Sequence, residues 1–288
     1  MPPFKGALMT ENDIYQKHLN HMYELHGVGE GAILSYMKRN LLSFEKEAGK
    51  GSLPILFFAE CGFDRVLKEM STRGLDFRTI KEEGSVATKT VLDDYLEQAK
   101  WYDADCLHVI INAGNYSKED LAKSFIKLCN LHKEHIQTKE KKTGCLNLDI
   151  VTDVFLKEGF EFSLLANGKV PFYALCDIYD LMSTKKIEIS ESYQKMIVSC
   201  IQKGLDAGVD LNVVDENFRT GFSFKSMELK SKFVRYQSIK DDERLLDLFM
   251  VVDGLLKGDV APDAPQKIAK HVHQLRKDIS NAKKRMRF

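Results

Sequence analysis

The sequence of 288 residues lacks any hydrophobic run that approaches the roughly 20 residues needed to span a bilayer. Its first residues, Met1 to Lys5, lack the apolar stretch of a secretory signal. The formal net charge is zero, which argues against a chain that binds nucleic acid over its whole surface. With 44% hydrophobic residues, the chain has enough apolar surface for a substantial core, and we expect a soluble folded protein.

The six cysteines show neither a CxxC motif nor another short metal-ligand spacing. They are spread along the chain beside apolar neighbours, at Cys61, Cys106, Cys129, Cys145, Cys176 and Cys200. Because free cysteine commonly behaves as a small buried hydrophobe, we expect reduced core thiols in a cytoplasmic compartment.

Motifs of catalysis and metal binding are missing as well. The sequence has no GxxxxGK[ST], GxGxxG, GxSxG or kinase motifs. His18 and His21 can share a helix face, but no carboxylate or cysteine in sequence completes a metal shell. His132 and His135 do not have the spacing of HExxH and are interpreted as a polar helix end. The sequence therefore predicts no catalytic residue, no metal and no cofactor.

Glycines recur with a regular spacing. Residues 51–70 read GSLPILFFAECGFDRVLKEM, and Gly51 and Gly84 are 33 residues apart. Gly62 falls where two helices would meet and Gly74 where the second helix would stop, since glycine adopts the left-handed conformation at a helix end without strain. This pattern resembles the ankyrin repeat, a helix pair and turn of 33 residues with a GxTPLHxAAxxG core.

Further copies of the pattern follow. Residues 208–222 read GVDLNVVDENFRTGF and are similar to the family's hairpin GADVNAVDENGRTPL, with Phe218 in place of glycine and Gly221 in place of proline. Residues 155–175 give a third copy, and 109–115 suggest a fourth hairpin. The resemblance implies an all-α, ankyrin-like helical-repeat solenoid with extra helices at both ends and helical insertions.

The expected organisation has three parts. Residues 1–50 form an N-terminal helical cap, and 51–261 form about five divergent repeats, at 51–83, 84–123, 124–167, 168–217 and 218–261. Residues 262–288 form a basic helix with eight Lys or Arg against two Asp. Its apolar stripe favours docking as a C-terminal cap, which leaves 283–287 free to contact acidic protein, nucleic acid or anionic lipid.

The resemblance also implies a function. Ankyrin-like stacks hold partner proteins with their hairpin tips and the inner face of each first helix. Carried over position by position, the partner-binding residues are Glu60, Phe63, Asp64, Lys81, Glu82, Tyr116, Asn167, Tyr173, Asp177, Asp215, Glu216 and Phe222.

We therefore expect a non-enzymatic scaffold that binds another protein, either in its own cell or as an effector that a bacterium secretes into a host cell. The divergent ankyrin proteins of intracellular bacteria have similarly irregular repeats. The alternative is an enzyme whose site lies in the N-terminal helices or in the segment 84–150.

Overall fold

The computed structural model describes residues 11–44, 53–80, 89–99, 101–138, 147–185, 189–256 and 264–286. These residues are predominantly helical, with one short two-stranded ribbon, as the all-α class requires. The chain divides into two compact units. The first unit comprises residues 1–128 and 141–160, and the second comprises 129–140 and 161–288.

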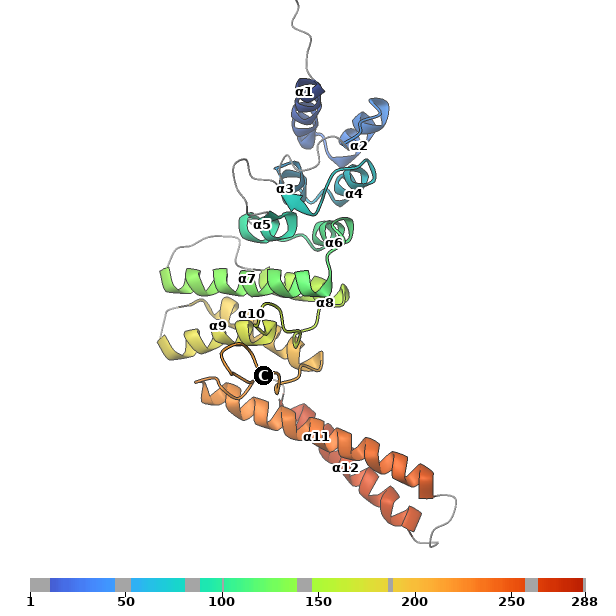
Figure 1. The fold of residues 1–288 in the computed structure, drawn as a ribbon, viewed down its shortest axis with the longest axis vertical. Helices are drawn as coiled ribbons and strands as arrows, with labels where there is room; N and C mark the ends of the chain where they lie inside the picture. Colours follow the sequence, from blue (N-terminus) through green and yellow to red (C-terminus); the bar gives the residue numbers. More distant parts are fainter. Residues whose placement is uncertain are drawn as a thin grey trace, which may run out of the picture. The chain divides into compact units, whose positions relative to one another are not determined.

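The first unit consists of short helices in antiparallel pairs (Figure 1). The helices are α1 (Glu11–Glu24), α2 (Glu30–Arg39), α3 (Leu53–Glu60), α4 (Asp64–Thr72), α5 (Val91–Gln98), α6 (Ala104–Ala113), the start of α7 (Lys118–Thr138), and α8 (Leu148–Lys157). A 3-10 turn, Leu25–Gly27, joins α1 to α2. Strands β1 (Thr79–Ile80) and β2 (Lys89–Thr90) pair antiparallel, with Thr79 opposite Thr90.

Alternate helices of the first unit pack on one another. Helix α2 contacts α4, α4 contacts α6, and α6 contacts α8, so that these four form a column on one side of the unit (Figure 1). Helix α4 buries Val66, Leu67 and Met70 in this column. Glu30 at the start of α2 caps its neighbour, because its Oε1 accepts the backbone N–H groups of Arg65 at 2.8 Å and Val66 at 3.1 Å. One helix pair is thus tied to the next through the helix ends.

Local turn chemistry sets the helix boundaries where the sequence predicts them. Gly62 (φ +70°) and Gly74 (φ +91°) take the left-handed conformation between and after α3 and α4. Pro171 begins α9, at the position where a missing N–H costs nothing. Ser117 and Asp120 cap each other's backbone N–H groups at the start of α7, at 3.0 and 3.2 Å. The turns expected at Gly62 and Gly74 are thus confirmed.

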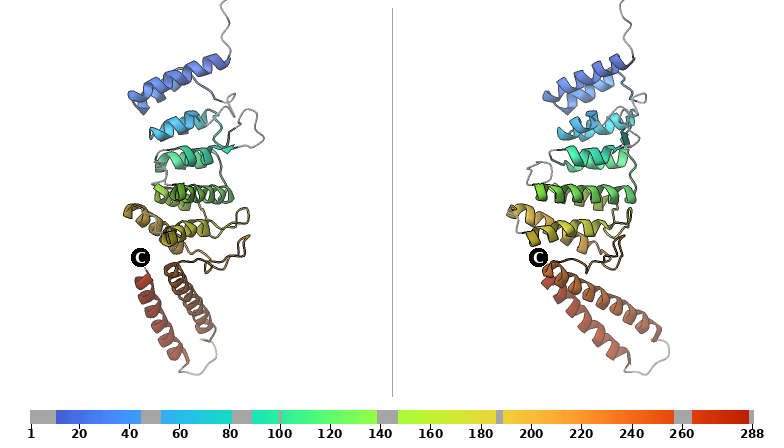
Figure 2. Two further views of the ribbon diagram at one scale, coloured as in Figure 1. Left: turned by 90° about the vertical axis from the view of Figure 1, so that its left-hand side faces the viewer. Right: turned by 60° about the vertical axis from the view of Figure 1, so that its left-hand side comes forward.

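The second unit has longer helices. It contains the end of α7, α9 (Pro171–Lys185), α10 (Glu191–Asp206), α11 (Met227–Leu256) and α12 (Ala264–Met286). Helix α9 packs on α10, and α11 packs on α12 (Figure 2). Gly204 permits the approach of α10 to α9, because a Cβ there would lie 2.6 Å from the ring of Phe172. Helices α9 and α10 occupy most of the residues between 168 and 208.

Three details of the expected parse differ from the structure. The hairpin at 109–115 is wrong, because residues 104–113 form α6 and the left-handed residue is Asn115 (φ +48°) rather than Gly114 (φ −80°). The boundary expected between 123 and 124 falls inside α7. The unit expected at 218–261 contains one helix of 30 residues, α11, in place of a helix pair.

Candidate interaction surface

Two loops of the second unit lie side by side. The first turns at Asn167 (φ +48°) and Gly168 (φ +73°), an Asn-Gly pair that suits a type I′ turn, and an isolated β-bridge joins Ala166 to Lys169. The second connects α10 to α11. The backbone N–H of Glu216 donates to the carbonyl of Gly168 at 2.6 Å, so the second loop is fixed to the first.

The second loop is held from within by buried polar groups. Asp215 accepts the backbone N–H groups of Asn217 and Arg219, both at 2.9 Å, and the Nε–H of Arg219 at 2.8 Å. Arg219 also donates to Asp177 at 2.8 Å, and Lys133 pairs with the other oxygen of Asp177 at 3.2 Å. Burial alone would raise the pKa of Asp215, but the hydrogen bonds and charge of Arg219 outweigh it and lower the pKa. The loop is therefore a rigid support.

Apolar side chains project from the tips of these loops. The exposed fractions are 89% for Phe218, 51% for Val214 and 48% for Leu165. Phe218 has φ +57°, a left-handed conformation that strains a bulky residue. We name Leu165, Asn167, Val214, Glu216 and Phe218 the hairpin-tip surface. Asn167 and Glu216 supply its polar groups, and Glu216 lies 3.7 Å from Lys169 in an exposed pair.

Among the residues predicted to bind a partner, some serve the scaffold instead. Tyr173 is completely buried, and its hydroxyl lies within hydrogen-bond distance of the carbonyls of Leu211 and Val213. Asp215 is buried, and Asp177 is paired with two cations. Sequence position alone placed all three on a binding face, whereas the structure shows that they fix the loop behind the tips.

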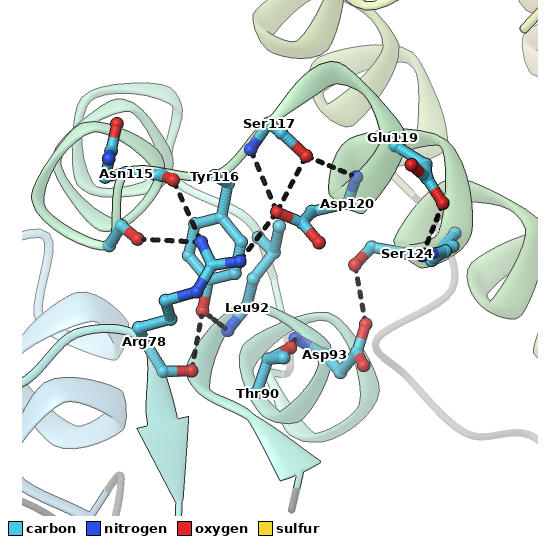
Figure 3. Close-up of polar contacts among 12 residues, drawn as sticks. Arg78, Thr90, Leu92, Asp93, Asn115, Tyr116, Ser117, Glu119, Asp120 and Ser124 are labelled. Atoms are coloured by element: carbon cyan, nitrogen blue, oxygen red, sulfur yellow. Dashed lines mark hydrogen bonds and ion pairs between the residues drawn. The ribbon is translucent and has the colours of Figure 1, made fainter. Parts of the chain in front are cut away.

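Tyr116 has a similar structural role in the first unit (Figure 3). Its hydroxyl accepts the N–H of Leu92 at 3.0 Å and donates towards the carbonyl of Phe77 at 3.0 Å. Burial raises its pKa to about 12. Arg78 lies over the ring at 5.3 Å and donates to Asp120 at 2.9 Å. The cluster joins the strand segment to the starts of α5 and α7, so the hydroxyl of Tyr116 is used to hold these elements together.

Polar groups between α5 and α7 are also engaged with one another. Asp93 is buried, accepts the hydroxyl of Ser124 at 2.6 Å and pairs with Lys127 (Figure 3 draws the Ser124 contact). The backbone N–H of Asp93 donates to Thr90, which caps α5. The acid is thus used to hold the two helices together.

The remaining predicted residues are Glu60, Phe63, Asp64, Phe222, Lys81 and Glu82. Glu60, Phe63 and Asp64 are half-buried at the turn between α3 and α4 in the first unit. Phe222 is half-buried in the loop that carries Phe218. Lys81 and Glu82 fall outside the described residues. Sequence reasoning did not identify Leu165, Val214 and Phe218 as exposed apolar residues at the loop tips; the departure from glycine at 218 was the available signal.

Histidine and cysteine side chains are the groups in the chain best suited to hold a transition metal. Within the described ranges, no group of three His, Cys, Asp or Glu side chains could hold a metal ion. The expectation of a polar helix end at His132 is wrong, because this side chain is completely buried and contacts Tyr193. Four cysteines are buried as free thiols and one is half-buried, as expected of core residues, and Cys145 lies outside the described residues.

None of the helices in the described part of the chain combines the length and hydropathy needed to traverse a bilayer. Comparison of the chain with protein-family models, with curated proteins and with solved structures finds no match. The function is therefore inferred from the contacts of the chain itself.

Proposed function

We propose that this chain is a non-enzymatic, ankyrin-like scaffold that binds a partner protein through the hairpin-tip surface. The column of α2, α4, α6 and α8 and the left-handed turn residues support the ankyrin-like architecture. In this architecture, each helix pair and its loop form one divergent repeat. The observation that carries the function is Phe218, an aromatic side chain 89% exposed at the tip of a braced loop.

The conformation of Phe218 is unfavourable for the isolated chain. The left-handed backbone costs a residue with a Cβ roughly 1–2 kcal/mol. An exposed phenylalanine also forgoes the roughly 1.5–3 kcal/mol that burial of such a side chain provides. A partner that covers Phe218 would recover the free energy of burying the phenylalanine side chain. The rigid loop would limit the entropy lost on binding. Strain retained at an exposed tip is typical of a binding residue.

The surroundings of Phe218 fit a protein partner. Val214 in the same loop and Leu165 in the neighbouring loop are also exposed, and the backbone N–H of Glu216 joins the two loops by donating to the carbonyl of Gly168. In this proposal they form the apolar centre, and Asn167 and Glu216 form its polar edge. An apolar centre with a polar rim is the usual anatomy of a protein interface. Phe222, in the same loop, is a secondary contact in this proposal.

The enzyme alternative receives less support. It requires reactive groups in the N-terminal helices or in 84–150, but Asp93, Ser124 and Lys127 in that segment bond to one another and join α5 to α7. Tyr116 is likewise committed to backbone carbonyls. We therefore propose binding rather than catalysis, and the described contacts favour a structural use of these polar groups.

A photocrosslinking experiment tests the proposal. Benzoylphenylalanine replaces Phe218 in the full chain. The chain is irradiated in an extract of the cells that make it and, for the case of a secreted effector, in an extract of the host cell. Val28, exposed at a turn of the first unit, is replaced in the matched control. We expect one protein adduct at 218 that excess unlabelled chain removes and excess Phe218→Ser chain does not. Identical adducts at both positions, or equal competition by both chains, would contradict the proposal.

The variant Phe218→Gly separates binding from folding. Glycine adopts φ +57° without strain, so we expect unfolding free energy to rise by about 1 kcal/mol while the adduct partner binds more weakly. Weaker binding together with a less stable fold would point to a structural role for Phe218 instead.

A further inference from the structure

Helix α12 carries a row of lysines on one face. Lys270, Lys277 and Lys284 are exposed and follow one another at intervals of seven residues. Each interval turns an α-helix only about 20° from a straight line and advances it about 10 Å. The three lysines therefore leave the helix along one line about 20 Å long.

The opposite face of α12 is occupied. Val272 and Leu275 are half-buried and Ile279 is buried, and α12 packs along α11 (Figures 1 and 2). At 100° per residue, these three side chains lie on the far side of the helix from the lysine row. Their packing against α11 fixes which face of α12 points outward, so the lysine row faces away from α11.

The row is not neutralised within its own helix. Asp278 is the one acidic residue between 264 and 286. It lies about 100° around the helix from Lys277 and accepts hydrogen bonds from Gln274 at 2.9 and 3.1 Å. Beside the row, the exposed residues are His273, Ser280 and Asn281, which carry hydrogen-bonding groups.

Helix stability does not account for the row. Cations near a helix C-terminus interact favourably with the helix dipole, and this interaction alone explains a lysine at position 284. Lys270 and Lys277, however, lie more than one turn from either end of α12, beyond the reach of the dipole, so the dipole does not account for them. Solubility is also served by surfaces of mixed sign, and three cations in line are not needed for it.

We propose that this lysine row binds the phosphate backbone of a nucleic-acid duplex. A helix that binds a membrane surface inserts an apolar face into the lipid, whereas α11 covers the apolar face of α12. Lysine, serine and asparagine side chains are common phosphate ligands. The line of about 20 Å is also long enough to meet several phosphates, which follow one another at about 3.4 Å along each strand of a duplex.

Fluorescence anisotropy of the full chain with a labelled DNA duplex of roughly 20 base pairs tests this proposal. Binding is measured from about 50 to about 200 mM salt. The slope of log K against log salt has a magnitude of about 0.9 for each neutralised phosphate, so K270Q/K277Q/K284Q is expected to reduce it by about 2.7. The matched control K17Q/K38Q/K68Q removes three exposed lysines of the first unit and should leave the slope unchanged.

Each other outcome overturns the proposal. If the chain does not bind the duplex at about 50 mM salt, the row is a solvated face. If both triple variants lower the slope equally, the attraction belongs to net charge rather than to α12. If vesicles containing phosphatidylserine bind the chain and the duplex does not, the row serves a lipid surface. Circular dichroism of the three proteins verifies that the helices are retained.

Discussion

Protonation of His132 should destabilise the second unit in mildly acidic solution. Its Nδ1 lies 2.7 Å from the hydroxyl of Tyr193, and the two rings stack at 5.8 Å with an interplanar angle of 27°. Its Nε2 is buried and has no hydrogen-bond partner among the described residues. Burial, with a smaller contribution from His135, lowers the pKa of His132 to about 3. The imidazole is thus held neutral in the fold.

The sign and size of the effect follow from proton linkage. In the unfolded chain His132 has its ordinary pKa near 6.5, so between pH 6.5 and about 3 the unfolded state binds one more proton than the folded state. Stability therefore falls as the pH falls, by about 1.4 kcal/mol per pH unit, or about 2 kcal/mol between pH 7 and 5. Asp120 and Asp215, whose pKa values are lowered from 3.8, lose their contributions at more acidic pH.

Hydrogen exchange of the backbone amides in α7, α9 and α10 measures this stability directly. Wild type should lose about 2 kcal/mol of protection between pH 7 and 5, after correction for intrinsic exchange. In His132→Phe, which keeps a ring but cannot titrate, the loss should shrink to a few tenths of a kcal/mol. The exposed His273→Gln serves as the matched control and should behave as wild type. Equal losses in wild type and His132→Phe would refute the reasoning.

Three further variants test the local structure. Gly208→Val should lower the unfolding free energy by roughly 1–2 kcal/mol, because Gly208 has φ +82° and valine is strained in this conformation. A Cβ at position 208 would meet nothing within 4 Å, so backbone strain rather than a clash is the cause. Gly27→Val is the control in the same denaturant titrations. Asp215→Ala should cost about 2 kcal/mol by leaving N–H groups of the loop unpaired, whereas Asp215→Asn should cost less in the same titration. Deletion from Pro262 onward should lower the melting temperature by exposing α11, and deletion of 283–288 alone should leave it nearly unchanged; equal melting of the longer deletion and the full chain would show that α12 is not a cap.

Much of the helical pattern could be predicted because its causes are local. The capping pair Ser117–Asp120 acts across three residues, and Gly62 and Gly74 mark turns whose backbone conformation few other residues adopt. The same local reasoning failed at 109–115, where an apolar run before Gly114 is compatible with both a helix end and a hairpin. Helix α6 packs between α4 and α8, and this packing favours the helix over the hairpin. The packing depends on residues far away in the sequence, so the local pattern could not predict it.

The roles of polar residues were harder to predict because they depend on distant partners. His132 finds Tyr193, 61 residues away, and Tyr116 finds the carbonyl of Phe77, 39 residues away. In sequence, each is a polar residue near a helix end, and such residues are exposed in most cases. Only the fold shows that these side chains are used to join elements, and the candidate binding residues chosen by repeat position therefore included Tyr173 and Asp215, which are buried.

The exposed apolar residues at the loop tips required a different kind of comparison. A sequence compared with a repeat pattern draws attention to agreement, and residues 208–217 agree well with the ankyrin hairpin. The informative position is the disagreement at 218, where phenylalanine replaces the glycine that φ +57° favours. Backbone conformation alone would favour glycine at this position, and the strained phenylalanine therefore supports the proposal that a partner contacts it. Neighbouring Asp215 agrees with the pattern, and here agreement indicates a structural role. Its buried carboxylate accepts hydrogen bonds from Arg219 and so supports the strained loop tip.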